Sequence, residues 1–209
     1  AYAPGETVTD DIIAIVSGKL PRLPAEIGAP MFHAVRRPTD VDDLTREFGK
    51  FLDRALSSRI ERDYMVIGAL KPEWVAAAKA AGLRPESAEI AVTDVSIQHT
   101  FRGTPHITAP GRASNRAAKV SPLDLTWYRD LPRHLLSPRA VLLDQTQREP
   151  VFILVYDVPG SAAKLVIKID SYVKKAGKEL NLVQSGRLVL LEDLKGDVAR
   201  GMKIIEGKI

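Results

Sequence analysis

The chain has 209 residues, of which 45% are hydrophobic and 27% charged, a composition typical of a folded globular protein and not of a disordered one. It has no cysteine, which excludes disulfide scaffolds and thiolate metal sites. Its longest apolar runs are far shorter than the roughly 20 residues of a membrane span, so we expect no membrane partner and a cytoplasmic location.

Positive charge is concentrated in the second half of the chain. Residues 1–95 carry 12 Lys and Arg against 15 Asp and Glu, whereas residues 96–209 carry 18 against 11. A local excess of cations favours polyanion partners through long-range attraction and counterion release. A solvated basic surface has the same composition. Charge alone therefore leaves open whether the second half binds nucleic acid.

The first 60 residues are predicted to form an N-terminal extension. Residues 1–38 contain five prolines around one short apolar stretch, which is typical of a connector. Hydrophobic residues then recur at helical spacing over residues 41–60, and Thr39 is the expected N-cap. We expect residues 1–60, Pro-rich and helical, to be separable from an α+β domain at 61–195, followed by a C-terminal tail at 196–209.

A strand, a helix and a second strand are predicted next. Residues 64–70 are short and apolar, as in a strand. Pro72 suits the first turn of the following helix, and Gly82 suits the position after its end. Residues 89–95 fit a strand or an extended lead-in. Residues 96–120 are polar and basic and predict a short helix followed by a long loop.

A further helix and a run of strands complete the prediction. Ser121 is the expected N-cap of this helix, and Pro132 is expected to shorten or kink it. Strands joined by short turns, the last of them QSG at residues 184–186, pair as antiparallel neighbours. The predicted fold class is α+β, an antiparallel β-sheet meander with helices packed on one face, preceded by the helical N-terminal extension. The predicted strands are residues 141–144, 151–158, 164–170, 179–183 and 187–191.

His99, Arg102 and His106 form a compact group that suits metal-independent RNA cleavage. Such cleavage needs a base for the ribose 2′-OH, an acid for the 5′ leaving oxygen and a cation for the phosphorane. Histidine titrates near neutral pH, and the guanidinium fork fits a phosphate. Exposed loop residues without special chemistry show the same pattern, so both interpretations stay open. The spacing H-x6-H lacks a nearby carboxylate and matches no compact zinc pattern, so we expect neither a metal nor another cofactor.

The order of several segments resembles a family of nuclease domains. IGALKPEWVAAAKAAGL is followed by EIAVTDVSIQHTFRGTPH, then by DLTWYRDLPRHLLSPRAVLLD, and then by VFILVYDV and KLVIKID. This order, with its His-x-x-Arg and second His, resembles the barnase/EndoU/colicin/RelE-like nuclease domains at the C-termini of MuF-type phage head proteins and in polymorphic toxins. The resemblance covers residues 64–191. The chain departs from it at Gln184-Ser185-Gly186-Arg187, where such domains often carry Thr or Ser followed by an aromatic residue.

The resemblance implies a metal-independent ribonuclease, of toxin type or delivered by a phage, with RNA as its substrate. It implies a site that includes the His-x-x-Arg group and that extends to Ser185 and Arg187 in the last hairpin. Lys168 is a further candidate for holding phosphate because it alternates with the apolar residues of its strand, although a solvated lysine fits equally well. Phage head proteins or a cognate immunity protein are the implied protein partners, and the implied location is cytoplasmic or virion-associated.

Other residues are predicted to contact nucleic acid without catalysing a reaction. Arg112, Arg116 and Lys119 are spaced through a stretch with Gly, Ser and Asn and fit contacts to the phosphate backbone. Tyr128 is predicted to stack on a base of single-stranded RNA, whereas its neighbour Trp127 fits the core better. The alternative function is that of a non-catalytic phage virion or head-associated protein that binds nucleic acid.

Overall fold

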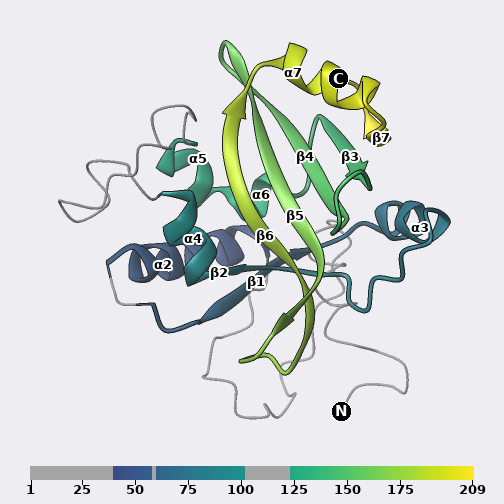
Figure 1. The fold of residues 1–209 in the computed structure, drawn as a ribbon. Helices are drawn as coiled ribbons and strands as arrows, with labels where there is room; N and C mark the ends of the chain where they lie inside the picture. The colour runs from purple at the N-terminus through teal and green to yellow at the C-terminus, as the bar shows by residue number, and fades with distance from the viewer. Residues whose placement is uncertain (1–39, 58–59, 102–122) are drawn as a thin grey trace.

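The computed structural model describes residues 40–57, 60–101 and 123–209, and their strands form one seven-stranded sheet (Figure 1). The strand order is β1-β2-β6-β5-β4-β3-β7. All neighbouring strands are antiparallel except β2 and β6, which pair in parallel through Ile90 with Asn181 and Ala91 with Leu182. None of the helices in these residues is both long and apolar enough to span a membrane.

Helix α2 (Val41–Ser57) is part of the main core. Asp40 caps it, because its Oδ1 accepts a hydrogen bond from the amide of Asp43 at 2.8 Å, whereas the expected cap, Thr39, lies outside the described residues. The helix buries one apolar stripe against the sheet and ends before the predicted residue 60. Helix α2 and the sheet therefore share one hydrophobic core. The stripe consists of Leu44, Phe48, Phe51, Leu52 and Ala55.

The first sheet edge follows the sequence prediction closely. Strand β1 (Tyr64–Ala69) pairs with β2 (Glu89–Thr93), and α3 (Pro72–Ala80) connects them. Pro72 occupies the first turn of α3, and Gly82 has φ 84°, a left-handed conformation that glycine adopts without strain. The predicted helix boundaries here are confirmed.

Three short helices follow β2 on the same face of the sheet as α2. They are α4 (Asp94–Thr100), α5 (Leu125–Arg129) and α6 (Leu131–His134). Asp124, and not Ser121, is the N-cap of α5, since its Oδ1 accepts from the amides of Thr126 and Trp127 at 2.7 and 3.2 Å. Pro132 lies in the first turn of α6, so the single predicted helix is broken in two as expected of this proline.

Strands β3 (Ala140–Asp144), β4 (Val151–Val158) and β5 (Ser161–Val173) form the predicted antiparallel meander with β6 (Lys178–Val189). The prediction of a turn at residues 184–186 is wrong, because β6 continues through these residues as one strand. The register shifts there instead: Val166 faces Ser185 and Ile167 faces Val183, which leaves Gln184 as a bulge. Gly186 permits close packing, since a Cβ there would lie 2.5 Å from Leu123 Cδ1.

Two further elements, a helix and a strand, follow β6. Helix α7 (Leu191–Ala199) lies over the sheet face opposite α2, and β7 (Lys203–Gly207) pairs with β3 (Figure 1). Leu194 of α7 is fully buried among aliphatic residues of β3, β4 and β5. The α+β prediction with helices on one face is confirmed for α2 to α6, and α7 adds a helix to the other face.

Candidate functional site

His99 is the one catalytic candidate of the His-x-x-Arg group that falls within the described residues. It lies in the last turn of α4, and its side chain is exposed. A capping box fixes the start of this helix: Thr93 Oγ1 accepts from the Ser96 amide at 3.1 Å, and Ser96 Oγ accepts from the Thr93 amide at 3.2 Å. Buried Ile97 holds the helix to the core. Arg102 and His106 lie outside the described residues.

Helix α4 lies beside β6, the strand that carries two other candidates (Figure 1). Strand β2 leaves the sheet after Thr93 and pairs with β6 only near Asn181, so among the described strands the later part of β6 has β5 as its hydrogen-bonded neighbour. Ser185 and Arg187 belong to this later part. The structure therefore brings the helix of His99 and the strand of Arg187 into contact.

The side chains of these candidates nevertheless face different sides of the sheet. Arg187 is the cross-strand partner of Lys164, which contacts α7, and Ser185 is the partner of Val166, which packs in the α7 cluster. Ile97 of α4 packs in the cluster on the opposite face. His99 and the β6 candidates are therefore brought to neighbouring elements but not into one described cleft.

The three strand candidates differ in how they are engaged. Lys168 forms an ion pair with Glu149 at 2.8 Å, which holds the pKa of that carboxyl below its usual range. Ser185 is half-buried, and Arg187 is exposed with no ion pair to any described residue. Arg187 is thus the strand candidate that lacks an anionic partner among residues 40–57, 60–101 and 123–209.

Tyr128 does not present its ring to a ligand in this structure. The side chain is fully buried, with the Phe101 ring edge-on at 5.1 Å and Phe48 at 6.1 Å. Burial raises the pKa of its hydroxyl. The prediction that Tyr128 stacks on a base is therefore wrong for this conformation, and the cause is its position on the core-facing side of the five-residue helix α5. Its neighbour Trp127 is partly buried and packs against the core, as expected.

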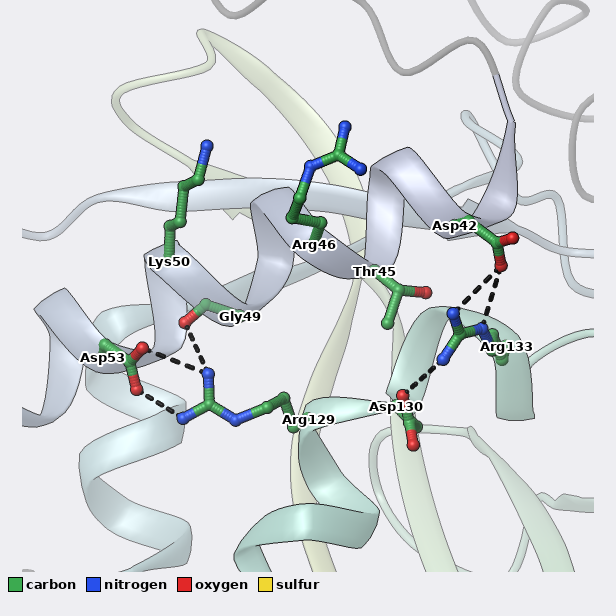
Figure 2. A pocket seen from close by; sticks show the side chains of 9 residues that line it. All are labelled: Asp42, Thr45, Arg46, Gly49, Lys50, Asp53, Arg129, Asp130 and Arg133. Carbon is green, nitrogen blue, oxygen red and sulfur yellow. Dashed lines mark hydrogen bonds and ion pairs between the residues drawn. The ribbon is translucent and has the colours of Figure 1, made fainter.

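A hollow of about 440 Å³ lies between α2 and the pair α5–α6 (Figure 2). Arg129 forms two hydrogen bonds with Asp53, at 2.5 and 3.1 Å, and a third with the carbonyl of Gly49 at 3.3 Å. Arg133 bridges Asp42 and Asp130, with its closest contacts at 3.0 and 2.8 Å. The hydrogen bonds from Arg129 lower the pKa of Asp53.

The charges of this hollow serve the packing of the helices. Arg46 and Lys50 also line it, but they point away from Arg129 and Arg133 and pair with Asp43 and Glu47 on their own helix (Figure 2). All four cations are therefore matched by carboxylates, and a polyanion would have to displace them. We interpret the hollow as the contact that positions α5 and α6 on α2.

Ion pairs between residues 1–95 and residues 96–209 neutralise part of the excess positive charge of the second half. Four cations of the basic second half are paired with carboxylates of the acidic first half, which offsets part of their contribution to a polyanion surface. By contrast, residues 102–122 contain four Lys and Arg and no Asp or Glu. The predicted contacts Arg112, Arg116 and Lys119 belong to this segment, which lies outside the described residues. The pairs between halves are Asp42–Arg133, Asp53–Arg129, Asp63–Lys175 and Glu89–Lys178.

A second hollow, of about 580 Å³, lies beside α7 and contains residues that sequence reasoning missed. Lys164, whose side chain is only 8% exposed, pairs with Asp197 at 3.2 Å, and Asp197 also pairs with Arg200 at 2.5 Å. Arg187 lines the same hollow. Lys164 and Lys168 are four residues apart in one strand and therefore lie on the same side of it, which indicates a charged strand face. Nothing in the sequence indicates that α7 covers this face.

The described residues present no cluster of candidate metal ligands. No group of three or more His, Asp or Glu side chains within 40–57, 60–101 and 123–209 is arranged to hold a metal ion. Comparison of the chain with protein-family models, curated proteins and solved structures finds no match.

Proposed function

We propose that the chain is a metal-independent ribonuclease that cleaves RNA through the ribose 2′-OH. The observation that carries the proposal is the place of His99, exposed at the end of a helix fixed by a capping box and a buried Ile97. The chain continues from this helix into residues 102–122, which contain Arg102, His106 and a net positive charge unopposed by carboxylates. The resemblance to phage-associated nuclease domains supports the same centre.

The chemistry needs one base, one acid and a cation. One histidine of the pair His99 and His106 removes the proton from the 2′-OH, and the 2′-oxygen attacks the adjacent phosphorus. The bond from phosphorus to the 5′-oxygen breaks, and the other histidine, protonated, donates its proton to that oxygen. The products are a 2′,3′-cyclic phosphate and a 5′-hydroxyl. Arg102 stabilises the charge that grows on the phosphorane oxygens.

Arg187 is the best strand candidate for a supporting phosphate contact. It is exposed, it has no ion pair to a described residue, and its strand contacts α4. Lys168 is less suited, since Glu149 already occupies its ammonium group at 2.8 Å. Because Arg187 lies on the face of the sheet opposite α4, we assign it only to phosphates away from the cleaved bond and leave proton transfer to the two histidines.

Cleavage of a defined oligoribonucleotide in the presence of EDTA tests the proposal. We expect cleavage with 2′,3′-cyclic phosphate ends, a bell-shaped dependence of rate on pH, and a loss of about 10²- to 10⁴-fold for His99→Ala. Val95→Ala is the matched control, because Val95 is an exposed residue of the same helix. Retention of RNA without any cleavage would support the alternative, a non-catalytic nucleic-acid-binding protein.

A further inference from the structure

The end of the β5–β6 hairpin, residues 170–179, projects beyond β1 and β2 as an arm (Figure 1). The register between β5 and β6 shifts between Lys168 and Ser171, and Asp170 within this shift has φ 47°. A bulge with a left-handed residue bends a strand and changes the direction of the residues after it. The arm therefore leaves the sheet at a defined bend.

Three contacts along the arm fix it in place. Asp170 Oδ1 accepts a hydrogen bond from the amide of Glu86 at 2.9 Å. Burial opposes the ionisation of Asp63, but its ion pair with Lys175 at 3.0 Å helps to keep the pKa of Asp63 low. Lys178 pairs with Glu89, whose side chain is almost fully buried. These contacts tie the arm to β1, β2 and the segment before β2, so its side chains are presented in a fixed arrangement.

The arm exposes the ring of Tyr172, with Glu179 opposite it across the strand pair and three lysines in the residues that follow it. Tyr172 is 65% exposed, more than any other large hydrophobic side chain of the described residues. Lys174 follows two residues later, is exposed, and has no ion pair to a described residue. Lys175 and Lys178 keep 46% and 50% of their side chains exposed despite their pairs.

We infer that this arm binds single-stranded nucleic acid, with a base stacked on Tyr172 and the backbone phosphates near Lys174. Stacking on an exposed aromatic ring combined with nearby cations is how proteins hold single strands without reading their sequence. Aromatic residues are enriched at protein interfaces, but lysine is depleted there. The lysines of the arm therefore favour a nucleic acid over a protein partner. The inference rests on the proposed function only in taking RNA as the polyanion.

Binding of a fluorescent 2′-O-methyl oligoribonucleotide tests the arm separately from cleavage, since this probe lacks the 2′-OH nucleophile. We expect Tyr172→Ala to weaken binding by about tenfold, within the range measured for base stacking on aromatic side chains, and Tyr172→Trp to restore it. Lys174→Ala should lower the slope of log affinity against log salt by about 0.7, the value for one phosphate contact on a single strand.

Two exposed residues away from the arm serve as matched controls. Leu190 is 61% exposed at the other end of the hairpin, and Lys203 is an exposed strand lysine with no ion pair to a described residue. Leu190→Ala and Lys203→Ala should leave probe binding unchanged.

The inference is overturned if Tyr172→Ala binds the probe as tightly as the parent chain, whether or not the protein cleaves RNA. A Tyr172→Ala chain that loses self-association but keeps probe affinity would assign the arm to a protein interface instead. A parent chain that cleaves no RNA, yet binds the probe in a way that depends on Tyr172, would overturn the proposed function and support the arm.

Discussion

The face of the sheet that carries α2 to α6 is covered by large aromatic side chains, whereas the face under α7 combines aliphatic residues with a buried ion pair. On the first face Trp74, Phe48, Tyr128 and Phe101 are almost fully buried. On the second, Leu194 of α7 is the fully buried helix residue, and Lys164 pairs with Asp197 beside it. The first face thus supplies most of the hydrophobic core. On the second face, α7 is held by both apolar contacts and an ion pair.

The two ends of the described chain complete opposite faces of one sheet. Helix α2, near the start, covers the aromatic face, and α7, near the end, covers part of the charged face. Strand β7 then extends the sheet beyond β3. Residues near both ends of the described chain therefore take part in the packing of the sheet.

Phe48→Ala should cause the largest loss of stability, because it opens a cavity in the aromatic face. Phe48 is fully buried and lies near the ring of Tyr128. We expect the free energy of unfolding to fall by about 3–5 kcal/mol in chemical denaturation, as for other buried Phe→Ala changes. A chain that begins at Arg62 should lose its cooperative transition altogether, since it lacks the whole buried stripe of α2.

Lys50→Ala provides the control on the exposed side of α2, where the change should stay within about 0.5 kcal/mol. A cooperative transition in the chain that begins at Arg62, at the parent midpoint, would show that α2 only rests on the core.

Asp197→Ala should have an intermediate effect on the α7 face. It leaves the ammonium group of Lys164, 8% exposed, without its carboxylate. Removing one partner of a buried ion pair is costly, and partial exposure of Asp197 moderates the cost, so we expect a loss of about 2–3 kcal/mol. The double change Lys164→Met with Asp197→Leu should recover most of it, because no charge then remains buried.

The exposed pair Glu192–Lys195 on the same helix is the matched control. Glu192→Ala should change stability by less than about 1 kcal/mol, since exposed pairs contribute little. Equal losses for Asp197→Ala and Glu192→Ala would contradict the distinction between a buried and a solvated pair on α7.

Local signals in the sequence predicted elements well and their partners poorly. Pro72 and Gly82 marked the limits of α3, because each residue has a strong backbone preference at a helix end. The prediction of a turn at Gln184-Ser185-Gly186 is wrong because the same residues also suit a β-bulge. The packing of Leu123 against Gly186 favours the bulge. The parallel pairing of β2 with β6 joins residues about 90 positions apart, which no local pattern encodes.

The candidate site shows the same limit. The sequence placed His99 on a short helix before a basic segment, and α4 confirms the helix. It could not show that Tyr128 as well as Trp127 packs on the core, because α5 is too short for its hydrophobic pattern to define a side. Nor could it show that Asp53 neutralises Arg129 across 76 positions, which removes one cation from the polyanion surface.

The smallest expected effect is a pH dependence of stability from His134 on the aromatic face. Its ring stacks on Trp127 at 4.2 Å, with Tyr156 at 5.8 Å, and burial lowers the pKa of His134 despite the opposing charge of Asp130. In the unfolded chain a histidine has a pKa of about 6.5. The unfolded state therefore binds more protons than the folded state as pH falls below that value. The stabilising contribution is complete above about pH 6.5 and is lost as pH falls toward the lower pKa of the folded state.

Denaturation midpoints measured between about pH 5 and 7.5 should therefore decrease as the pH is lowered. This pH range lies above the ordinary carboxyl pKa values of about 4. His134→Phe, which keeps a ring on Trp127, should flatten this decline. An equal decline in the His134→Phe chain would show that another group carries the pH dependence.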